Sequence, residues 1–171
     1  TYHYGDTVAE PAEPTKPADN TYTYTFKAWD KEVASVSGNV TYTATYDAMY
    51  IEYTVVFKNY DGTILSQRNY HYDDDIIVPE NPTQEANLIG TFEFVGWDIQ
   101  ITKCQGDKVY TATYDIVYID YTVVFKNYDG TVLSSKTYHY GDTVEEPSTP
   151  TKPADNTYTY TFKAWDKEVA S

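Results

Sequence analysis

Large apolar side chains occupy every second position along residues 53–58, and they are Tyr53, Val55 and Phe57. This alternation predicts a β-strand with one buried face. Asp61-Gly62 follows and favours a hairpin turn of type I′, because both residue types accept positive φ angles. We expect the return strand to run from Thr63 to about Tyr72.

The segment after this hairpin contains two prolines and is not expected to continue as a strand. Pro79 and Pro82 have no N–H to donate to a strand ladder, so we expect a crossover loop with room for one helical turn. A third strand then carries three aromatic residues, Phe92, Phe94 and Trp97. A turn over residues 105–107 leads to a fourth strand over residues 108–114. On that strand one face carries Tyr110, Ala112 and Tyr114, and the threonines share the other.

The whole pattern returns after 68 residues without a gap. Residues 53–63 reappear as residues 121–131 with the same sequence, YTVVFKNYDGT (121 − 53 = 68). Residues 1–35 return as residues 137–171, two periods later. A gapless period of this length indicates one structural unit copied in tandem. It favours a role in length, spacing or multivalent display over a single catalytic pocket.

The copies differ from one another in an ordered way. Residues 1–35 and 137–171 are identical at 32 of 35 positions, whereas residues 1–35 and 69–103 are identical at 12. The three exceptions in the first comparison are Ala9/Glu145, Ala12/Ser148 and Glu13/Thr149. Divergent neighbours would lower the risk of misassembly during folding. Duplication of a two-copy block explains the same alternation.

The chain is cut out of phase with its repeat. Residues 52–119 form a complete copy (copy two). Residues 1–51 are a partial repeat lacking its first hairpin (copy one), and residues 120–171 are a partial repeat lacking its last strand (copy three). Either the parent protein continues at both ends or a neighbouring chain supplies the missing strands. A phasing that begins with residues 1–68 is also open.

Three sets of residues are expected to carry the structure. The predicted core comprises Val55, Phe57, Phe94, Trp97, Phe26, Trp29, Val123, Phe125, Phe162 and Trp165. The predicted turns that fix strand register are Asp61, Gly62, Asp129 and Gly130. The predicted inter-repeat connectors contain Tyr46, Tyr50, Ile51, Tyr53, Tyr114, Tyr118, Ile119 and Tyr121. These connectors have no Gly, Pro or Ser, so we expect extended, nearly rigid links and a stiff rod.

Composition narrows the function classes. The net charge of −14 argues against nucleic acid and against an anionic membrane surface, because both recruit clustered Lys and Arg. Twenty tyrosines in 171 residues favour a β-rich fold. There is no apolar run of 18 residues, so no membrane insertion is expected. We see no catalytic constellation and no cofactor motif, and we expect the chain not to be an enzyme.

Cysteine, histidine and aspartate residues of this chain could have a reactive or metal-binding role, but each also has a structural explanation. Cys104 is expected to be a buried structural thiol, with an interchain bridge or a reactive thiol as the alternative. One histidine per copy, at His3, His71 and His139, fits a structural strand residue better than a metal ligand. The acidic run Asp73–Asp75 with Asp61 is expected to be a solvated loop and not a Ca²⁺ site.

Two further possibilities concern the strand surfaces. Lys58 and Lys126, each followed by an asparagine, raise the possibility of an isopeptide bond, but they lie on the face opposite the predicted core. The tyrosine faces could stack on sugars, although cross-strand pairing explains the same residues.

Four linked motifs resemble the Listeria–Bacteroides repeat family of bacterial surface proteins, also called the internalin B-repeat family. They are Val-x-Phe-x-x-Tyr-Asp-Gly-Thr (residues 55–63 and 123–131), Gly-Asp-x-Val-x-x-Pro-x-x-Pro (5–14 and 141–150), Tyr-x-Phe-x-x-Trp-Asp (24–30 and 160–166) and Tyr-Thr-Ala-Thr-Tyr. The middle copy departs from the pattern with Asp73 for the turn glycine and Gly96 for Ala28. The resemblance implies β-grasp-like, ubiquitin-like units in an extracellular stalk, and no catalysis. Mucin-binding-type repeats have a similar layout.

Three functions follow from the sequence as alternatives. The first is a rigid extracellular stalk or spacer of a bacterial surface protein or adhesin, in which each repeat contacts its neighbours in the chain. The second is a self-assembling filament whose copies join end to end by strand complementation. The third is a module that binds a host glycan or protein through its tyrosine-rich surface.

Overall fold

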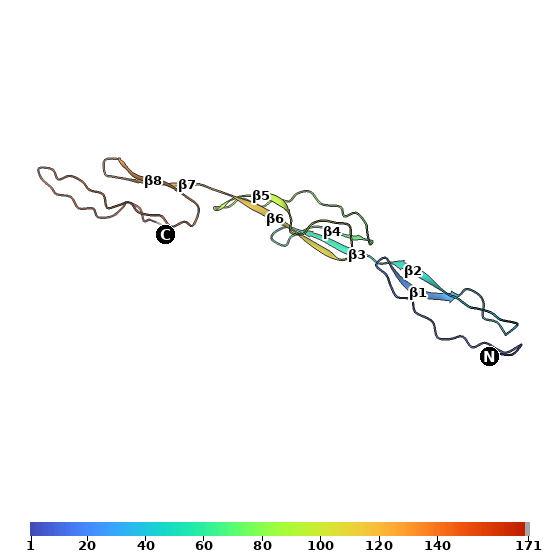
Figure 1. Cartoon of the computed structure of the whole chain (residues 1–171). Helices are drawn as coiled ribbons and strands as arrows, with labels where there is room; N and C mark the ends of the chain where they lie inside the picture. The colour runs from blue at the N-terminus through green and yellow to red at the C-terminus, as the bar shows by residue number, and fades with distance from the viewer. Residues whose placement is uncertain (170–171) are drawn as a thin grey trace. The chain divides into compact units, whose positions relative to one another are not determined.

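The computed structural model describes residues 1–169 of the chain, and its secondary structure in that range consists of strands without helices. The final two residues of predicted copy three lie outside the described range. The strands are β1 (Tyr22–Trp29), β2 (Ala44–Tyr50), β3 (Tyr53–Lys58), β4 (Ile64–Tyr70), β5 (Gly90–Trp97), β6 (Lys108–Tyr118), β7 (Tyr121–Lys126) and β8 (Val132–Tyr138). The fold is therefore β-rich and built from tandem repeats, as the sequence predicted (Figure 1).

The hairpins predicted to begin at Tyr53 and at Tyr121 are both present. β3 pairs antiparallel with β4, from Tyr53 opposite Tyr70 to Phe57 opposite Ser66, and the register then shifts before Lys58. The equivalent strands β7 and β8 pair in the same way and shift at the same place, between Phe125 and Lys126. The repeated sequence thus specifies the same hairpin and the same bulge twice.

The prediction of a type I′ turn at Asp61-Gly62 is wrong. Only Gly62 has a positive φ, of 87°, whereas Asp61 does not. The Gly62 N–H donates to the Asn59 carbonyl (2.9 Å) and the Asn59 N–H donates to the Thr63 carbonyl (2.8 Å). This is a turn centred on residues 60–61, followed by a glycine in the left-handed region, which is the usual three-residue hairpin loop with a bulge. The register shift lies farther from the turn, where Leu65 is skipped between Ser66, opposite Phe57, and Ile64, opposite Lys58.

The Asp61 side chain holds this turn from within. Its Oδ1 accepts a hydrogen bond from the Thr63 N–H (2.9 Å), and this bond lowers the pKa of the Asp61 carboxyl. Asp129 makes the same bond to the Thr131 N–H (3.0 Å), with the same direction of pKa shift. Aspartate at this position therefore contributes a side-chain acceptor to the turn and does not adopt a positive φ.

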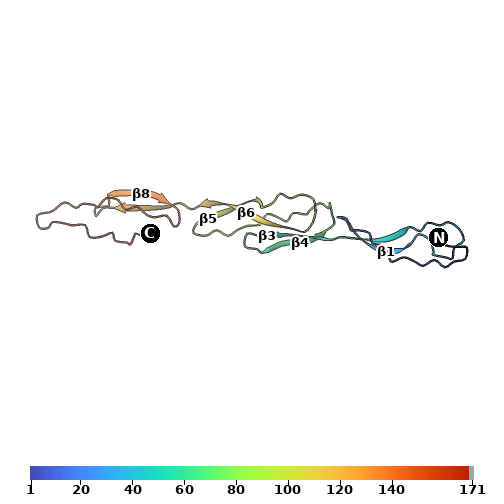
Figure 2. The ribbon, with the colours of Figure 1, turned by 60° about the horizontal axis from the view of Figure 1, so that its bottom comes forward.

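Copy two contains a four-stranded sheet in the order β4-β3-β6-β5 (Figure 1, Figure 2). β3 and β6 pair in parallel, from Val55 opposite Lys108 to Lys58 opposite Thr111. Two parallel neighbours need a crossover between them, and residues 71–89 provide it without any helix. The single helical turn allowed for in this loop is absent, in keeping with Pro79 and Pro82, which interrupt regular backbone hydrogen bonding.

The crossover begins with a turn that the middle copy builds without glycine. Gly5 and Gly141 have φ values of 87° and 88°, and Asp73 at the equivalent position has a φ of 69°. The Asp73 N–H donates to the Cys104 carbonyl (2.7 Å), as the Gly5 N–H does to the Val36 carbonyl (2.8 Å). The substitution in the middle copy therefore keeps the turn and places a non-glycine residue in a costly region of backbone space.

Copies one and three each contribute one two-stranded sheet. β1 pairs antiparallel with β2, and β7 pairs antiparallel with β8. By sequence position, β1 and β2 correspond to β5 and β6, and β7 and β8 correspond to β3 and β4. Each flanking copy therefore shows half of the sheet seen in copy two.

The tertiary contacts divide the chain into two compact units. The first contains residues 1–80 and 97–112, and the second contains residues 81–96 together with the chain from Thr113 onward. The main buried cluster lies in the first unit and consists of Val55, Phe57, Tyr70, Cys104 and Tyr110. Phe125, in the second unit, is also buried.

Candidate functional site

The two junctions between copies are built in the same way. Only two residues separate β2 from β3, and only two separate β6 from β7. At the first junction the Ile51 N–H donates to the Thr21 carbonyl (2.9 Å), and the Tyr53 hydroxyl donates to the Asn20 carbonyl (2.9 Å). The first bond holds the end of copy one against the turn that precedes β1, and the second ties the first strand of copy two to the same turn.

The second junction repeats these bonds 68 residues later. The Ile119 N–H donates to the Ile89 carbonyl (3.0 Å), and the Tyr121 hydroxyl donates to the Leu88 carbonyl (2.9 Å). Asn20 and Thr21 are replaced by Leu88 and Ile89. Because the acceptors are backbone carbonyls, the junction does not depend on the side chains at those positions.

Two of the three recurrent histidines, His71 and His139, belong to these junctions. They directly follow the return strands β4 and β8, whereas the sequence predicted them within those strands. The His71 ring packs 4.6 Å from the Tyr50 ring, and the His139 ring packs 5.0 Å from the Tyr118 ring. His139 Nε2 also lies 3.2 Å from Asp120 Oδ1. Each of these two histidines therefore contacts the last strand of the preceding copy.

The other predicted connector residues lie on the strands that lead into the junctions. Tyr46 packs edge-on against Phe26 at 6.2 Å, and Tyr114 packs edge-on against Phe94 at 5.9 Å. These contacts lie within a copy, so Tyr46 and Tyr114 support the sheet next to each junction. Some of the predicted connector residues therefore lie in the link itself, and others lie in the sheet that precedes it.

The predicted core residues are buried to different degrees in the three copies. In copy two Val55 and Phe57 are each 1% exposed, and the Trp97 ring packs 4.7 Å from the Phe57 ring. Phe94, Phe26, Trp29, Val123 and Trp165 are partly buried. Phe162 is 37% exposed, although its ring lies 5.1 Å from that of Trp165.

The structure also buries residues that the predicted core omits. Tyr110 stacks on Phe57 at 4.9 Å, and burial raises the pKa of its hydroxyl. Tyr70 closes the other side, and its hydroxyl accepts a hydrogen bond from the Ile77 N–H (3.1 Å). The signal for Tyr110 was the alternation along the fourth strand. The signal for Tyr70 was its recurrence as Tyr2 and Tyr138.

Cys104 is buried at 1% exposure and forms no disulfide. This burial agrees with the predicted structural thiol, and the Sγ lies 3.8 Å from the Gly106 carbonyl oxygen. Near it, Lys103 Nζ lies 3.6 Å from Asp75 and 3.8 Å from Asp73, so a lysine faces the acidic run. Within residues 1–169 there is no cluster of three or more His, Cys, Asp or Glu with the arrangement of a metal site.

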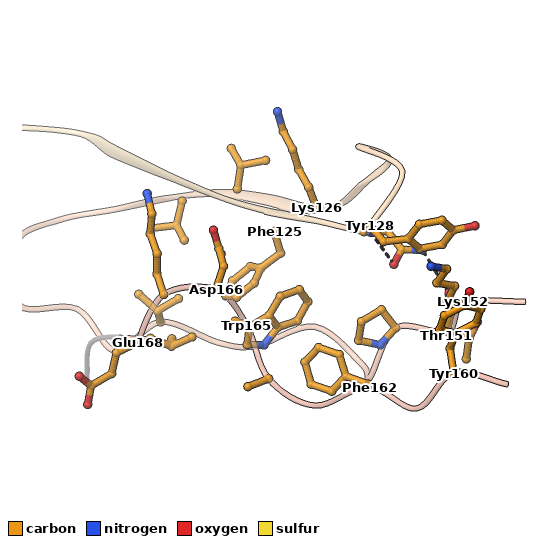
Figure 3. Close-up of a pocket in the computed structure, with 18 of the residues that line it drawn as sticks. Phe125, Lys126, Tyr128, Thr151, Lys152, Tyr160, Phe162, Trp165, Asp166 and Glu168 are labelled. Carbon is orange, nitrogen blue, oxygen red and sulfur yellow. Dashed lines mark hydrogen bonds between the residues drawn. The ribbon is translucent and has the colours of Figure 1, made fainter. Parts of the chain in front are cut away.

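Copy three carries an open cavity of about 810 Å³ (Figure 3). It lies between β7 and residues 160–169. Phe125 and Trp165 face each other across it with their rings 4.8 Å apart. At one end the Lys152 ammonium lies 3.7 Å from the centre of the Tyr160 ring and 4.9 Å from that of Tyr128. The cavity offers apolar surface beside a strand edge.

The segment of copy three that follows its hairpin, residues 139–169, is also held by polar contacts. The Asn127 side chain of the hairpin donates to the Thr151 carbonyl (3.2 Å), and within the segment the Trp165 Nε1–H donates to Glu146 Oε2 (3.0 Å). Lys136 and Glu145 form an exposed ion pair at 2.7 Å, which lowers the pKa of Glu145 and raises that of Lys136. Such exposed pairs contribute little to stability.

The chain is similar to known proteins at the level of its repeat. The model of the Listeria-Bacteroides repeat domain matches two adjacent segments, residues 53–117 and 121–170. Two relatives from Evansella cellulosilytica are each 28% identical to this chain. One, named "Putative membrane protein", is matched over 81% of this chain and 20% of its own length.

The other relative is named "Putative Gly-rich membrane protein" and is matched over 95% of this chain and 19% of its own length. The chain thus spans about a fifth of the curated relatives it matches. No solved structure matches it. The described residues contain no helix long and apolar enough to cross a membrane.

Proposed function

Because the chain belongs to the Listeria-Bacteroides repeat domain family, we propose that it is a non-catalytic spacer segment of a bacterial cell-surface protein. The observation that carries this proposal is the junction, which recurs with the same two hydrogen bonds and the same histidine–tyrosine contact. When the links between repeats have fixed contacts, the number of repeats sets the length of the array.

The location at the cell surface is supported by two findings. The two relatives carry names that describe membrane proteins, and this chain corresponds to about a fifth of each. An acidic, cysteine-poor array with a net charge of −14 also suits a segment outside the cell, since it repels anionic surfaces. Antibody labelling of intact cells that carry the full-length protein tests this location. Labelling only after lysis would contradict it.

We also propose a β-grasp-like unit and a rod-like arrangement. The order β4-β3-β6-β5, with a parallel central pair, supports the first. In this unit an extended crossover replaces the helix that usually covers such a sheet. The second rests on the two-residue links, which contain no glycine or proline to loosen them.

The spacer proposal is tested by loosening one link. We expect the double substitution Ile119→Gly and Asp120→Gly to broaden the distance distribution measured by small-angle X-ray scattering, while circular dichroism stays unchanged. A matched control places the same two glycines in the exposed crossover, at Glu85→Gly and Ala86→Gly. Scattering curves that are the same for the wild-type chain and both variants would refute the rigid link.

A further inference from the structure

Tyr22 and Tyr50 form the last cross-strand pair of the β1–β2 sheet, at the end that leads into copy two. Their Cα atoms are partners in the strand register, and their ring centres lie 4.5 Å apart with an angle of 42° between the ring planes. Directly opposed residues on antiparallel strands are close enough for their side chains to interact. The two phenol rings are therefore in contact.

The backbone holds this pair on both sides. Beyond the end of the sheet, the Ile51 N–H donates to the Thr21 carbonyl (2.9 Å), and the Tyr22 N–H donates to Asp19 Oδ1 (2.8 Å). In the other direction the β1–β2 register continues without a shift as far as Phe26. The backbone that carries the two rings is therefore fixed by hydrogen bonds.

The side chains are restrained as well. A hydrogen bond with the Tyr50 hydroxyl is the main cause that raises the pKa of the Tyr22 hydroxyl. Tyr50 also packs against the His71 ring, with the ring centres 4.6 Å apart. Because the two hydroxyls meet and the ring centres are only 4.5 Å apart, the carbons ortho to the hydroxyls also lie close together.

The carbons ortho to a phenol oxygen are the positions at which two tyrosyl radicals couple. Each tyrosine first loses one electron and one proton from its hydroxyl to a one-electron oxidant. The radicals then form a carbon–carbon bond between ortho carbons, and the proton on each of these carbons moves to the oxygen of the same ring, which restores both phenols. The pair has lost two hydrogen atoms, and one molecule of hydrogen peroxide takes them up as it is reduced to two molecules of water by a haem peroxidase.

Copy two has the second tyrosine of this pair without the first. Tyr118 stands at the position of Tyr50, but Gly90 stands at the position of Tyr22. Tyr118 and Tyr50 are almost equally exposed, at 53% and 54%, and each packs on the histidine of its own junction. The two copies therefore differ in the partner ring, while the exposure and the histidine contact are the same.

We propose that Tyr22 and Tyr50 are a site of oxidative coupling, at which a peroxide and a haem peroxidase join the two rings as dityrosine within one chain. Since the rings are already in contact, coupling within a chain is faster than coupling between chains at low protein concentration. The net charge of −14 also keeps separate chains apart. The site belongs to copies that carry both tyrosines, and copy two has none.

The cross-link clamps the first junction. It closes a loop from Tyr22 to Tyr50, at the end of the sheet where the Ile51 N–H and the Tyr53 hydroxyl bind the turn before β1. A covalent loop restricts the unfolded chain, as a disulfide does. The coupling depends on the geometry of copy one and not on the spacer role, so either can fail without the other.

Oxidation of the full chain with hydrogen peroxide and a haem peroxidase tests the proposal. The product is digested, and mass spectrometry identifies peptides containing Tyr22 and Tyr50 that are joined with the loss of two hydrogen atoms. We expect this linkage in monomeric chains, with a yield per chain that does not change on dilution. Absence of the linkage, or its restriction to dimers and larger species, would overturn the proposal.

Two matched substitutions separate contact from exposure. Tyr50→Phe keeps the ring and removes the phenol, so it should lower the yield of the cross-link within the chain at least about tenfold. Tyr118→Phe makes the same change at a ring of equal exposure and should leave that yield unchanged. Circular dichroism checks that both variants keep the wild-type fold. Equal losses in the two variants would show that exposure alone governs the reaction and would refute the site.

Residue-specific hydrogen exchange of the oxidised monomer tests the clamp. The amides of β1 should exchange several-fold more slowly than in the untreated chain, because the cross-link opposes opening of the β1–β2 sheet. The amides of β7, in another sheet, should exchange as before. Unchanged exchange in β1 after coupling would contradict the clamp.

Discussion

One eight-residue segment occurs twice in this chain with two different structures. The sequence YTYTFKAW forms β1 (Tyr22–Trp29) in copy one and recurs as residues 158–165 in copy three, where it is not a strand. In copy one it pairs with β2, from Tyr22 opposite Tyr50 to Trp29 opposite Ala44. Intrinsic propensity is the same in both places, so the presence of a partner strand decides the structure.

The short-range contacts of the two segments are nevertheless alike. Asp19 accepts hydrogen bonds from the N–H groups of Thr21 and Tyr22 and from the Tyr24 hydroxyl. Asp155 accepts the equivalent bonds from Thr157, Tyr158 and Tyr160. Turns are thus fixed locally in this repeat, whereas strands depend on the neighbouring strand. A repeat of about 68 residues has a small core, so its strands are expected to need a neighbouring strand for stability.

Removing the central ring should have the largest effect, and it should differ between copies. Phe57→Ala in the closed core should lower the free energy of unfolding by about 3–5 kcal/mol. Phe125→Ala beside the open cavity should lower it less, by roughly 1–3 kcal/mol, because fewer contacts are lost. Urea denaturation followed by tryptophan fluorescence measures both. Equal losses would mean that copies two and three are packed alike.

Adding one methyl group should disturb the third strand of copy two. A Cβ on Gly90 would lie 2.2 Å from the Val117 carbonyl oxygen, whereas the counterpart of Gly90 in copy one is Tyr22. Gly90→Ala should therefore cost about 1–3 kcal/mol of stability. Gly38→Ala is the control, since no atom lies within 4 Å of its added Cβ. A neutral Gly90→Ala would show that β5 can shift to the position that β1 adopts.

Restoring the glycine of the flanking copies should stabilise copy two slightly. Asp73 has a φ of 69°, and glycine occupies this position in the other two copies. Asp73→Gly should raise the free energy of unfolding by up to about 1 kcal/mol, because the left-handed region costs a non-glycine residue about that much. The thermal midpoint by differential scanning calorimetry reports the change. A lower midpoint would assign a stabilising role to the Asp73 carboxylate beside Lys103.

Acid should affect the local turns of copies one and three equally. The Tyr24 hydroxyl, followed by two backbone N–H groups, lowers the pKa of Asp19, and the Tyr160 hydroxyl does the same for Asp155. A lowered pKa in the folded state means that the carboxylates stabilise the turns above pH ~4 and that this is lost as the pH falls further. NMR titration of the two carboxyl carbons should give closely similar curves. A normal pKa at Asp155 alone would show that the turn, too, needs the partner strand.

Much of the fold could be predicted from sequence because its signals are local and repeated. The alternation at Val55 and Phe57 located the core strand, and the 68-residue period located its counterpart. The turn type was wrong because an Asp-Gly pair is compatible with more than one hairpin loop, and the bulge before Lys58 depends on the whole hairpin. The repeat period predicts a strand at residues 158–165, as in β1, so it did not predict that these residues would lack strand structure.

The junction contacts were only partly predictable. Tyr50 and Tyr118 stood out because the linkers lack Gly and Pro, but their packing on His71 and His139 joins residues about twenty positions apart. The bonds that the Tyr53 and Tyr121 hydroxyls make to carbonyls 33 residues earlier left no side-chain signal in the sequence. Contacts between distant segments that use the backbone of one partner cannot be read from residue types.

The central claim is that a neighbouring strand, and not local sequence, makes the third strand of this repeat. Residue-specific hydrogen exchange by NMR tests it directly, since peptides of identical sequence could not be distinguished by mass. We predict that the amides of residues 22–29 exchange at least about tenfold more slowly than those of residues 158–165, because only the former donate within a sheet. Equal protection of the two segments would contradict this account.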